Sequence, residues 1–173
     1  MAELPLLNDT IECSCRDCAS ACYHKPGWFL PEEIKPAADL LGMTEEAFFK
    51  RYLSVDYFGL PNEFLYVLSP ATENSQPGEM FPLEPSGMCV FLKNGKCGIH
   101  AAKPFECKLY DHRKKIKSKE ESDKSTEGHL AVAEAWIPFK ARIAELLGRE
   151  PDVETNHLEV LGFMLNMLKR ATE

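Results

Sequence analysis

Hydrophobic residues recur at helical spacing in two long parts of this chain, and shorter strand-like runs lie between them. The segment EEIKPAADLLGMTEEAFFKRYL predicts two helices separated at Gly42, with Thr44 as the N-cap of the second. In that second helix Phe48, Tyr52 and Val55 fall on one face, which we expect to be buried.

The second helical pattern begins near Thr126 and predicts two amphipathic helices. Pro138 is expected to kink or restart the first helix, Gly148 to end it, and Asp152 to cap the second. The apolar positions are Leu130, Ala133, Ile137, Ile143, Leu146 and Leu147 in the first helix, and Val153, His157, Val160, Leu161, Met164, Leu165 and Leu168 in the second. We interpret His157 as a core or boundary histidine rather than as a ligand.

Two strand-like regions lie between these helical parts. NEFLYVLSP is a short β-rich run, and further along CVFLK and KCGIH flank Asn94-Gly95, a dipeptide that predicts a hairpin. Pro104 then suits the first turn of a short helix that carries Cys107. The charged run RKKIKSKEESDK, residues 113–124, contains one apolar residue, and we expect a solvated loop there.

Composition and charge narrow the classes of function. Twenty basic and 27 acidic residues give a net charge of −7, which argues against a nucleic-acid partner and against an anionic membrane surface. No stretch approaches the roughly 20 apolar residues of a membrane helix, and the first residues lack the basic region of a signal peptide. We therefore expect a cytoplasmic protein with no nucleic-acid or membrane partner.

The candidate chemistry lies in seven cysteines. In the cytoplasm ordinary thiols stay reduced, so clustered cysteines indicate metal or redox chemistry, and an odd number excludes complete disulfide pairing within one chain. One group lies in CSCRDCASACYH and the other in residues 89–107. The candidate metal ligands are Cys13, Cys15, Cys18, Cys22, Cys89, Cys97 and Cys107.

The spacing of the first group favours metal binding. Cys15 and Cys18 form a C-x2-C, in which two thiolates can share one tetrahedral ion. Four cysteines within ten residues cannot all face one point from a single regular element, so this segment must fold around what it binds. We predict that Cys15, Cys18 and Cys22 converge with the second group. The alternative for the second group is three small buried apolar side chains.

These motifs resemble the cysteine-cluster proteins of the YkgJ type, a zinc- or iron-chelating family that also resembles part of the flagellin lysine methylases. The family pattern begins with C-x2-C-x2-C-C, whose first, second and fourth thiols match Cys15, Cys18 and Cys22, while Ala21 stands at the third. The later segments CVFL, CGIH, Lys103-Pro104 and FECKLYD match the remainder of the pattern. The resemblance covers about residues 13–112. Cys13 has no counterpart in the pattern and is a candidate substitute for the thiol missing at Ala21.

The resemblance implies a metal ion as the partner, and thiolates suit both zinc and iron, an iron–sulfur cluster included. His100 stands where the family has Tyr; it is either a further ligand or a strand-end histidine that faces solvent. Two other functions stay open, a thiol–disulfide redox protein that uses Cys15 and Cys18, and an interaction module with a structural zinc. Enzymatic activity also stays open.

Together these observations predict a mainly α-helical (α+β) fold with a small β-hairpin and a cysteine-rich N-terminal segment organised by metal. The 173 residues, 45% of them hydrophobic, fit one globular domain or a domain with an appended subdomain. We expect residues 1–125 to form the cysteine-cluster metal-binding domain. Residues 126–173 are expected to form a C-terminal helical hairpin packed on it, so that both parts make one compact unit.

Overall fold

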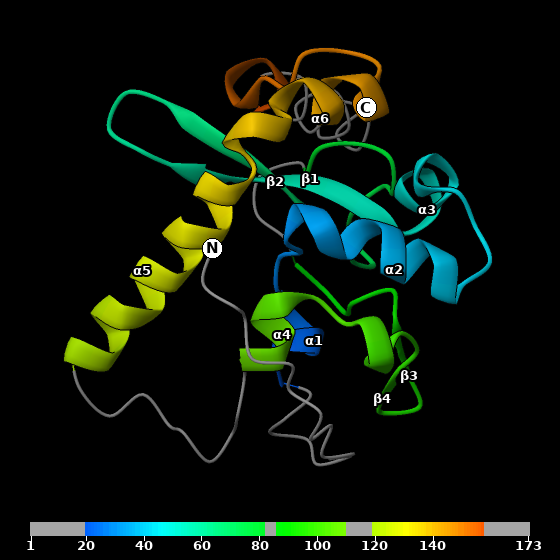
Figure 1. Cartoon of the computed structure of the whole chain (residues 1–173). Coiled ribbons are helices and arrows are strands. Elements are labelled where there is room, and N and C mark those ends of the chain that lie inside the picture. Colours follow the sequence, from blue (N-terminus) through cyan, green and yellow to red (C-terminus); the bar gives the residue numbers. More distant parts are fainter. Residues whose placement is uncertain (1–19, 82–85, 110–118, 158–173) are drawn as a thin grey trace, which may run out of the picture.

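Two antiparallel strands lie at the centre of the fold (Figure 1). β1 (Leu53–Gly59) pairs with β2 (Phe64–Pro70) along its whole length, from Leu53 opposite Pro70 to Gly59 opposite Phe64. The computed structural model describes residues 20–81, 86–109 and 119–157. In these residues helices and a small β component together confirm the predicted α+β class.

The helices that precede the sheet follow the predicted boundaries. A 3-10 turn, η1 (Pro31–Glu33), leads into α2 (Ile34–Leu40), and α3 (Glu45–Tyr52) follows after a break at Gly42, whose φ is 67°. The side chain of Thr44 accepts a hydrogen bond from the backbone of α3, as an N-cap does. Both the split and the cap are therefore confirmed.

The face predicted for α3 was wrong at Val55. The helix ends at Tyr52, and Val55 is a fully buried residue of β1. Its N–H donates to the carbonyl of Glu79 at 3.0 Å, and its carbonyl accepts from Phe81 at 2.9 Å. The sequence after Tyr52 is rich in aromatic and branched residues, and pairing with β2 outweighs the accidental helical spacing.

The later helices break where proline and glycine predicted. α5 (Lys119–Ala135) is followed by the 3-10 turn η3 (Ile137–Phe139) and by α6 (Lys140–Leu147), which ends at Gly148 with φ 76°. Asp152 Oδ1 then accepts two backbone N–H groups at the start of the helical turns over 153–157, so its capping role is confirmed.

Two expectations in this part were wrong. Residues 119–124 of the charged run expected to be a loop belong to α5, because Lys and Glu are good helix formers. The rest of the run, residues 113–118, lies outside the described residues. Ile137, expected on the buried side, is 57% exposed, because the break at Pro138 turns it away from the apolar face.

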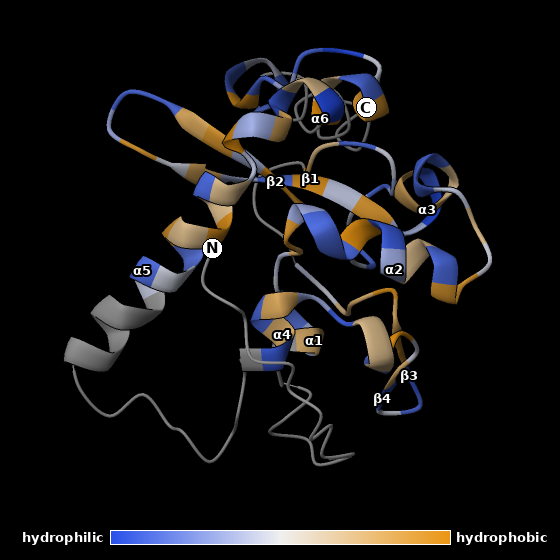
Figure 2. Cartoon of the chain, in the orientation of Figure 1, coloured by the Kyte–Doolittle hydropathy of each residue, from blue (hydrophilic) through white to orange (hydrophobic). Residues whose placement is uncertain are grey.

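One hydrophobic cluster joins the sheet to the helices around it. Phe29, Phe48, Leu68, Trp136 and Ile143 are among its fully buried side chains, and α5 and α6 both contact β2. Trp136 Nε1 donates to the carbonyl of Phe29 at 2.7 Å, so the largest core side chain also fixes the chain that enters η1. Figure 2 shows hydrophobic residues along the strands and hydrophilic residues at the turns. None of the described helices is both long and apolar enough to cross a membrane.

Short elements gather at the opposite end of the molecule from α6, below α2 in Figure 1. They are α1 (Ser20–His24), β3 (Leu92–Lys93), β4 (Lys96–Cys97), η2 (His100–Ala102) and α4 (Phe105–Leu109). β3 and β4 form the predicted hairpin, and its turn residues Asn94 and Gly95 both have positive φ, 51° and 73°. Two positive φ values are typical of a type I′ turn, whose twist matches the strands.

Candidate metal centre

The structure brings one cysteine of the first group together with all three of the second. Cys22 lies in α1, Cys97 in β4 and Cys107 in α4, while Cys89 precedes the small hairpin. The N–H of Cys89 donates to the carbonyl of Cys22 at 2.7 Å, which joins the two segments directly. Cys13, Cys15 and Cys18 lie outside the described residues.

Electrostatics shows that the four thiols share one neighbourhood. The pKa of Cys107 is raised well above its ordinary value, first by burial and then by the charges that Cys22, Cys89 and Cys97 would carry. The pKa of Cys89 is raised to about 12, again first by burial and then by Cys22 and Cys97. Thiolates at these positions would repel one another, and a cation among them would relieve that repulsion.

Backbone N–H groups nevertheless lower the pKa of these thiols. The N–H groups of Phe91 and Leu92 lower the pKa of Cys89, and the N–H of Ile99 lowers that of Cys97. The donors stand two and three residues after the cysteine, so each thiol sits in a turn of its own chain. Such donors favour the charged form of sulfur, which is the form that ligates metals.

Groups elsewhere in the chain also lower the pKa values of Cys107 and Cys22. The N–H of Gly27 lowers the pKa of Cys107, and the positive charge of Lys103 lowers that of Cys22, although burial raises both values overall. Without a cation, the desolvated thiols favour the neutral form. A bound metal ion reverses that balance, because it deprotonates coordinating thiols outright.

Gly27 permits the close approach between the N-terminal segment and α4. A Cβ built on this residue would lie 2.7 Å from Glu106 Cβ, 2.9 Å from Cys107 N and 3.1 Å from Cys107 Sγ. Real side chains do not tolerate such distances, so only glycine allows its N–H to reach the sulfur. The sequence offered no signal for this beyond a glycine between Pro26 and the hydrophobic segment that begins at Trp28.

The described residues do not by themselves complete a metal site. Among residues 20–81, 86–109 and 119–157, no group of three or more His, Cys, Asp or Glu side chains is placed to hold an ion. The donor set nevertheless fits a soft or borderline ion, because it consists of buried thiols with N–H donors beside them. In addition, Thr72, which lies opposite Cys89, has a buried hydroxyl with no hydrogen-bond partner in the part of the chain that the structure describes.

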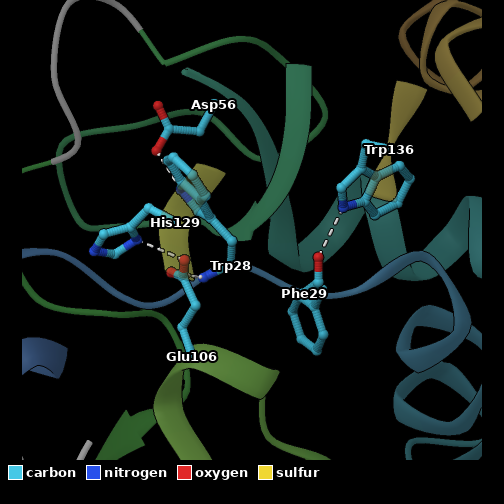
Figure 3. A network of polar contacts seen from close by, with 6 residues as sticks. All are labelled: Trp28, Phe29, Asp56, Glu106, His129 and Trp136. Carbon is cyan, nitrogen blue, oxygen red and sulfur yellow. Dashed lines mark hydrogen bonds and ion pairs between the residues drawn. The ribbon is translucent and has the colours of Figure 1, made fainter. Parts of the chain in front are cut away.

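A polar network surrounds α4 and connects it to the core (Figure 3). Glu106, the neighbour of Cys107, accepts the N–H of Trp28 at 2.7 Å on one oxygen and pairs with His129 Nδ1 at 2.6 Å on the other. The indole N–H of Trp28 donates to Asp56 at 2.7 Å. Glu106 thereby holds the chain in place at Trp28. The preceding residue is Gly27, whose N–H lowers the pKa of Cys107.

The pKa values of His129 and Asp56, two titratable residues of this network, are both raised. The hydrogen bond to Glu106 raises the pKa of His129, and burial raises the pKa of Asp56. Asp56 is 2% exposed, and both of its oxygens accept hydrogen bonds, from Trp28 and from the N–H of Tyr57. The carboxylates of this network thus have hydrogen-bond partners within it. The network also fixes Trp28, next to Gly27, whose N–H lowers the pKa of Cys107.

Glu33 fixes α4 from the other side. Its carboxylate accepts the N–H of Phe105 at 2.8 Å and pairs with Lys108 at 2.5 Å, more than 70 residues away in sequence. Its carboxylate also accepts the N–H of Leu30 at 2.9 Å, at the start of η1. Sequence reasoning missed its contact with α4, because no local pattern encodes a partner so distant.

The described histidines differ in their burial and in their contacts. His100 lies half-buried in η2, and His24 is exposed at the end of α1. His157 is half-buried beside Tyr57, with His157 Nε2 3.4 Å from the tyrosine hydroxyl, which confirms a boundary histidine. His129, which the sequence did not single out, is the histidine that joins the network around α4.

Comparison with known protein families gives one match. A family model named CxxCxxCC, with the description "Putative zinc- or iron-chelating domain", matches residues 14–127. This range contains six of the seven cysteines and every described element from α1 to α4. Comparisons with curated proteins and with solved structures give no significant match.

Proposed function

The chain belongs to the CxxCxxCC family of zinc- or iron-chelating domains, and on that premise we propose that it binds its metal through cysteines of two distant segments. The ligands are drawn from Cys13, Cys15, Cys18 and Cys22 in the first segment and from Cys89, Cys97 and Cys107 in the second. Zinc and iron, the latter also as an iron–sulfur cluster, are the two candidate metals.

The observation that carries this proposal is the meeting of Cys22 with Cys89, Cys97 and Cys107. Backbone N–H groups lower the pKa of Cys89, Cys97 and Cys107, which favours the thiolate form that ligates metals and which small apolar side chains would not need. The bond between Cys89 N–H and the Cys22 carbonyl brings the first cysteine segment against the second. A metal bound by both segments would stabilise their junction.

The outer contacts around the site support the same role. Glu106 and Glu33 fix α4 from two sides, and Gly27 lets the chain pass close to the Cys107 sulfur. Residues that orient the elements carrying the ligands are a regular part of metal sites, and their removal weakens binding without removing a ligand. The metal itself, when bound, supplies the positive charge that four neighbouring thiolates require.

The test is anaerobic purification of the full chain, followed by elemental analysis and an ultraviolet–visible spectrum. We expect stoichiometric zinc or iron, with colour only in the case of iron. Cys89→Ser and Cys107→Ser should lower the metal content at least tenfold, whereas His157→Gln, on the boundary beside Tyr57, should leave it unchanged. Circular dichroism verifies that each variant is folded.

Two results would contradict the proposal. One is a folded wild-type chain that contains neither metal and does not take up zinc added under reducing conditions. The other is a metal-free protein in which Cys15 and Cys18 form a reversible disulfide, which would indicate the thiol redox function instead.

A further inference from the structure

Thr72 carries a buried hydroxyl that the described structure leaves without a partner. The residue is 2% exposed, and its Oγ1 makes no hydrogen bond within the described part of the chain. Its backbone is fully used, since its N–H donates to Ser75 Oγ at 2.8 Å and its carbonyl accepts the Ser75 N–H at 3.1 Å. Buried hydroxyls are nearly always hydrogen bonded, so the neighbours of Thr72 determine which acceptor it can use.

The residue opposite Thr72 is Cys89. The two form an isolated antiparallel bridge, flanked by hydrogen bonds from Glu73 N–H to the Met88 carbonyl and from Val90 N–H to the Ala71 carbonyl, both 3.0 Å. This arrangement is a non-hydrogen-bonded pair, in which the opposite side chains lie on the same face and closer together than in the other type of pair. The side chains of Thr72 and Cys89 are therefore cross-strand neighbours.

The protonation state of Cys89 decides whether its sulfur is a useful acceptor. A neutral thiol is a weak acceptor, whereas a metal-bound thiolate carries charge and accepts strong hydrogen bonds. Cys89 is 5% exposed, so water reaches its sulfur poorly. The backbone N–H groups of Phe91 and Leu92 lower the pKa of Cys89 from its own chain, and Thr72 lies opposite Cys89 on the neighbouring segment.

We propose that Thr72 is a positioning residue of the metal centre, whose hydroxyl donates to the sulfur of metal-bound Cys89. This inference rests on the proposed function, because it requires Cys89 to be a thiolate ligand. The hydrogen bond disperses the charge of the thiolate and holds the Cys89 side chain in one orientation. Both effects favour the metal-bound form over the metal-free form.

The test compares wild type with Thr72→Val and Thr72→Ser, as full-length chains prepared metal-free under reducing conditions. Valine keeps the branched shape but removes the donor, and serine keeps the donor. Zinc affinity is measured by competition with a chromophoric chelator, and the sulfur-to-metal charge-transfer band is recorded with cobalt(II). We expect Thr72→Val to weaken zinc binding about tenfold and to move the cobalt band to longer wavelength. Thr72→Ser should stay near wild type in both measurements.

The metal-free forms separate this role from ordinary packing. Removing an unpartnered buried hydroxyl should leave the melting temperature of metal-free Thr72→Val equal to or above that of wild type. If Thr72→Val binds zinc with wild-type affinity and an unchanged cobalt band, the inference fails while the proposed function stands. If serine does not restore the wild-type values, the hydroxyl is not the cause and the inference also fails. If wild type binds neither metal, the proposed function fails first.

Discussion

The aromatic core and the cysteine end of this molecule are built in opposite ways. The core consists of two seven-residue strands covered by longer helices, with Phe29, Phe48 and Trp136 fully buried. The cysteine end consists of elements of two to five residues, joined by single backbone hydrogen bonds and by the carboxylates of Glu33 and Glu106. We therefore expect the core to be stable by itself and, on the proposed function, the cysteine end to depend on the metal that its thiols bind.

The largest loss of stability should come from a substitution in the aromatic core. Trp136→Ala removes the largest fully buried side chain and the hydrogen bond to the Phe29 carbonyl, so we expect a loss of about 3–5 kcal/mol in the free energy of unfolding. Urea denaturation followed by circular dichroism measures it. Metal content per folded molecule should not change, and a parallel loss of metal would show that the two regions are not separable.

Removal of the metal should have a smaller and local effect. After chelation, amides of α1, the β3–β4 hairpin and α4 should exchange with deuterium about 100-fold faster or more, which corresponds to roughly 2.7 kcal/mol of lost protection. Protection of β1 and β2 should change little. Equal loss of protection throughout the chain would contradict the contrast between the two regions.

The close contact between Gly27 and α4 can be disrupted by a substitution at Gly27. Gly27→Ala forces a Cβ against Glu106 and Cys107, so we expect a loss of about 1–3 kcal/mol, comparable to overpacking elsewhere. Metal affinity should fall with it, because α4 must shift. Gly128→Ala is a matched control, since a Cβ there meets nothing within 4 Å and α5 should tolerate alanine. An unaffected metal affinity in Gly27→Ala would show that the Gly27 contact is dispensable.

The smallest effect should be a pH dependence at His129. Its pKa in the folded protein is raised by Glu106, so the charged pair contributes fully below the ordinary histidine pKa of about 6.5, and the contribution is lost as pH rises through the folded value. His129 is 43% exposed, which limits the effect to about 1 kcal/mol or less.

The difference in stability between wild type and His129→Gln isolates this contribution, because buried Asp56 titrates in both proteins. Urea denaturation at a series of pH values should show that difference shrinking as pH rises. A difference that is constant or that grows with pH would contradict the assignment of the raised pKa to the Glu106 pair.

Local chemistry determined much of this fold. Thr44 and Asp152 cap their helices, Gly42 and Gly148 end theirs, and Asn94-Gly95 makes the turn of the small hairpin. Each feature depends on conformational preferences or hydrogen bonds within a few residues, so the sequence alone could predict it. The same holds for the short helix that carries Cys107.

Features that depend on distant partners were decided only by the tertiary structure. Val55 lies in β1 rather than in its expected helix, because its backbone pairs with β2. Gly27, Thr72 and the network of Glu106 with His129 carry no local signal, because their partners are 17 to 80 residues away. The sequence by itself determined which side chains can bind a metal. Only the packing of α1, the small hairpin and α4 on one core decided that Cys22 meets Cys89, Cys97 and Cys107, since the direction of each short element is set by contacts outside it.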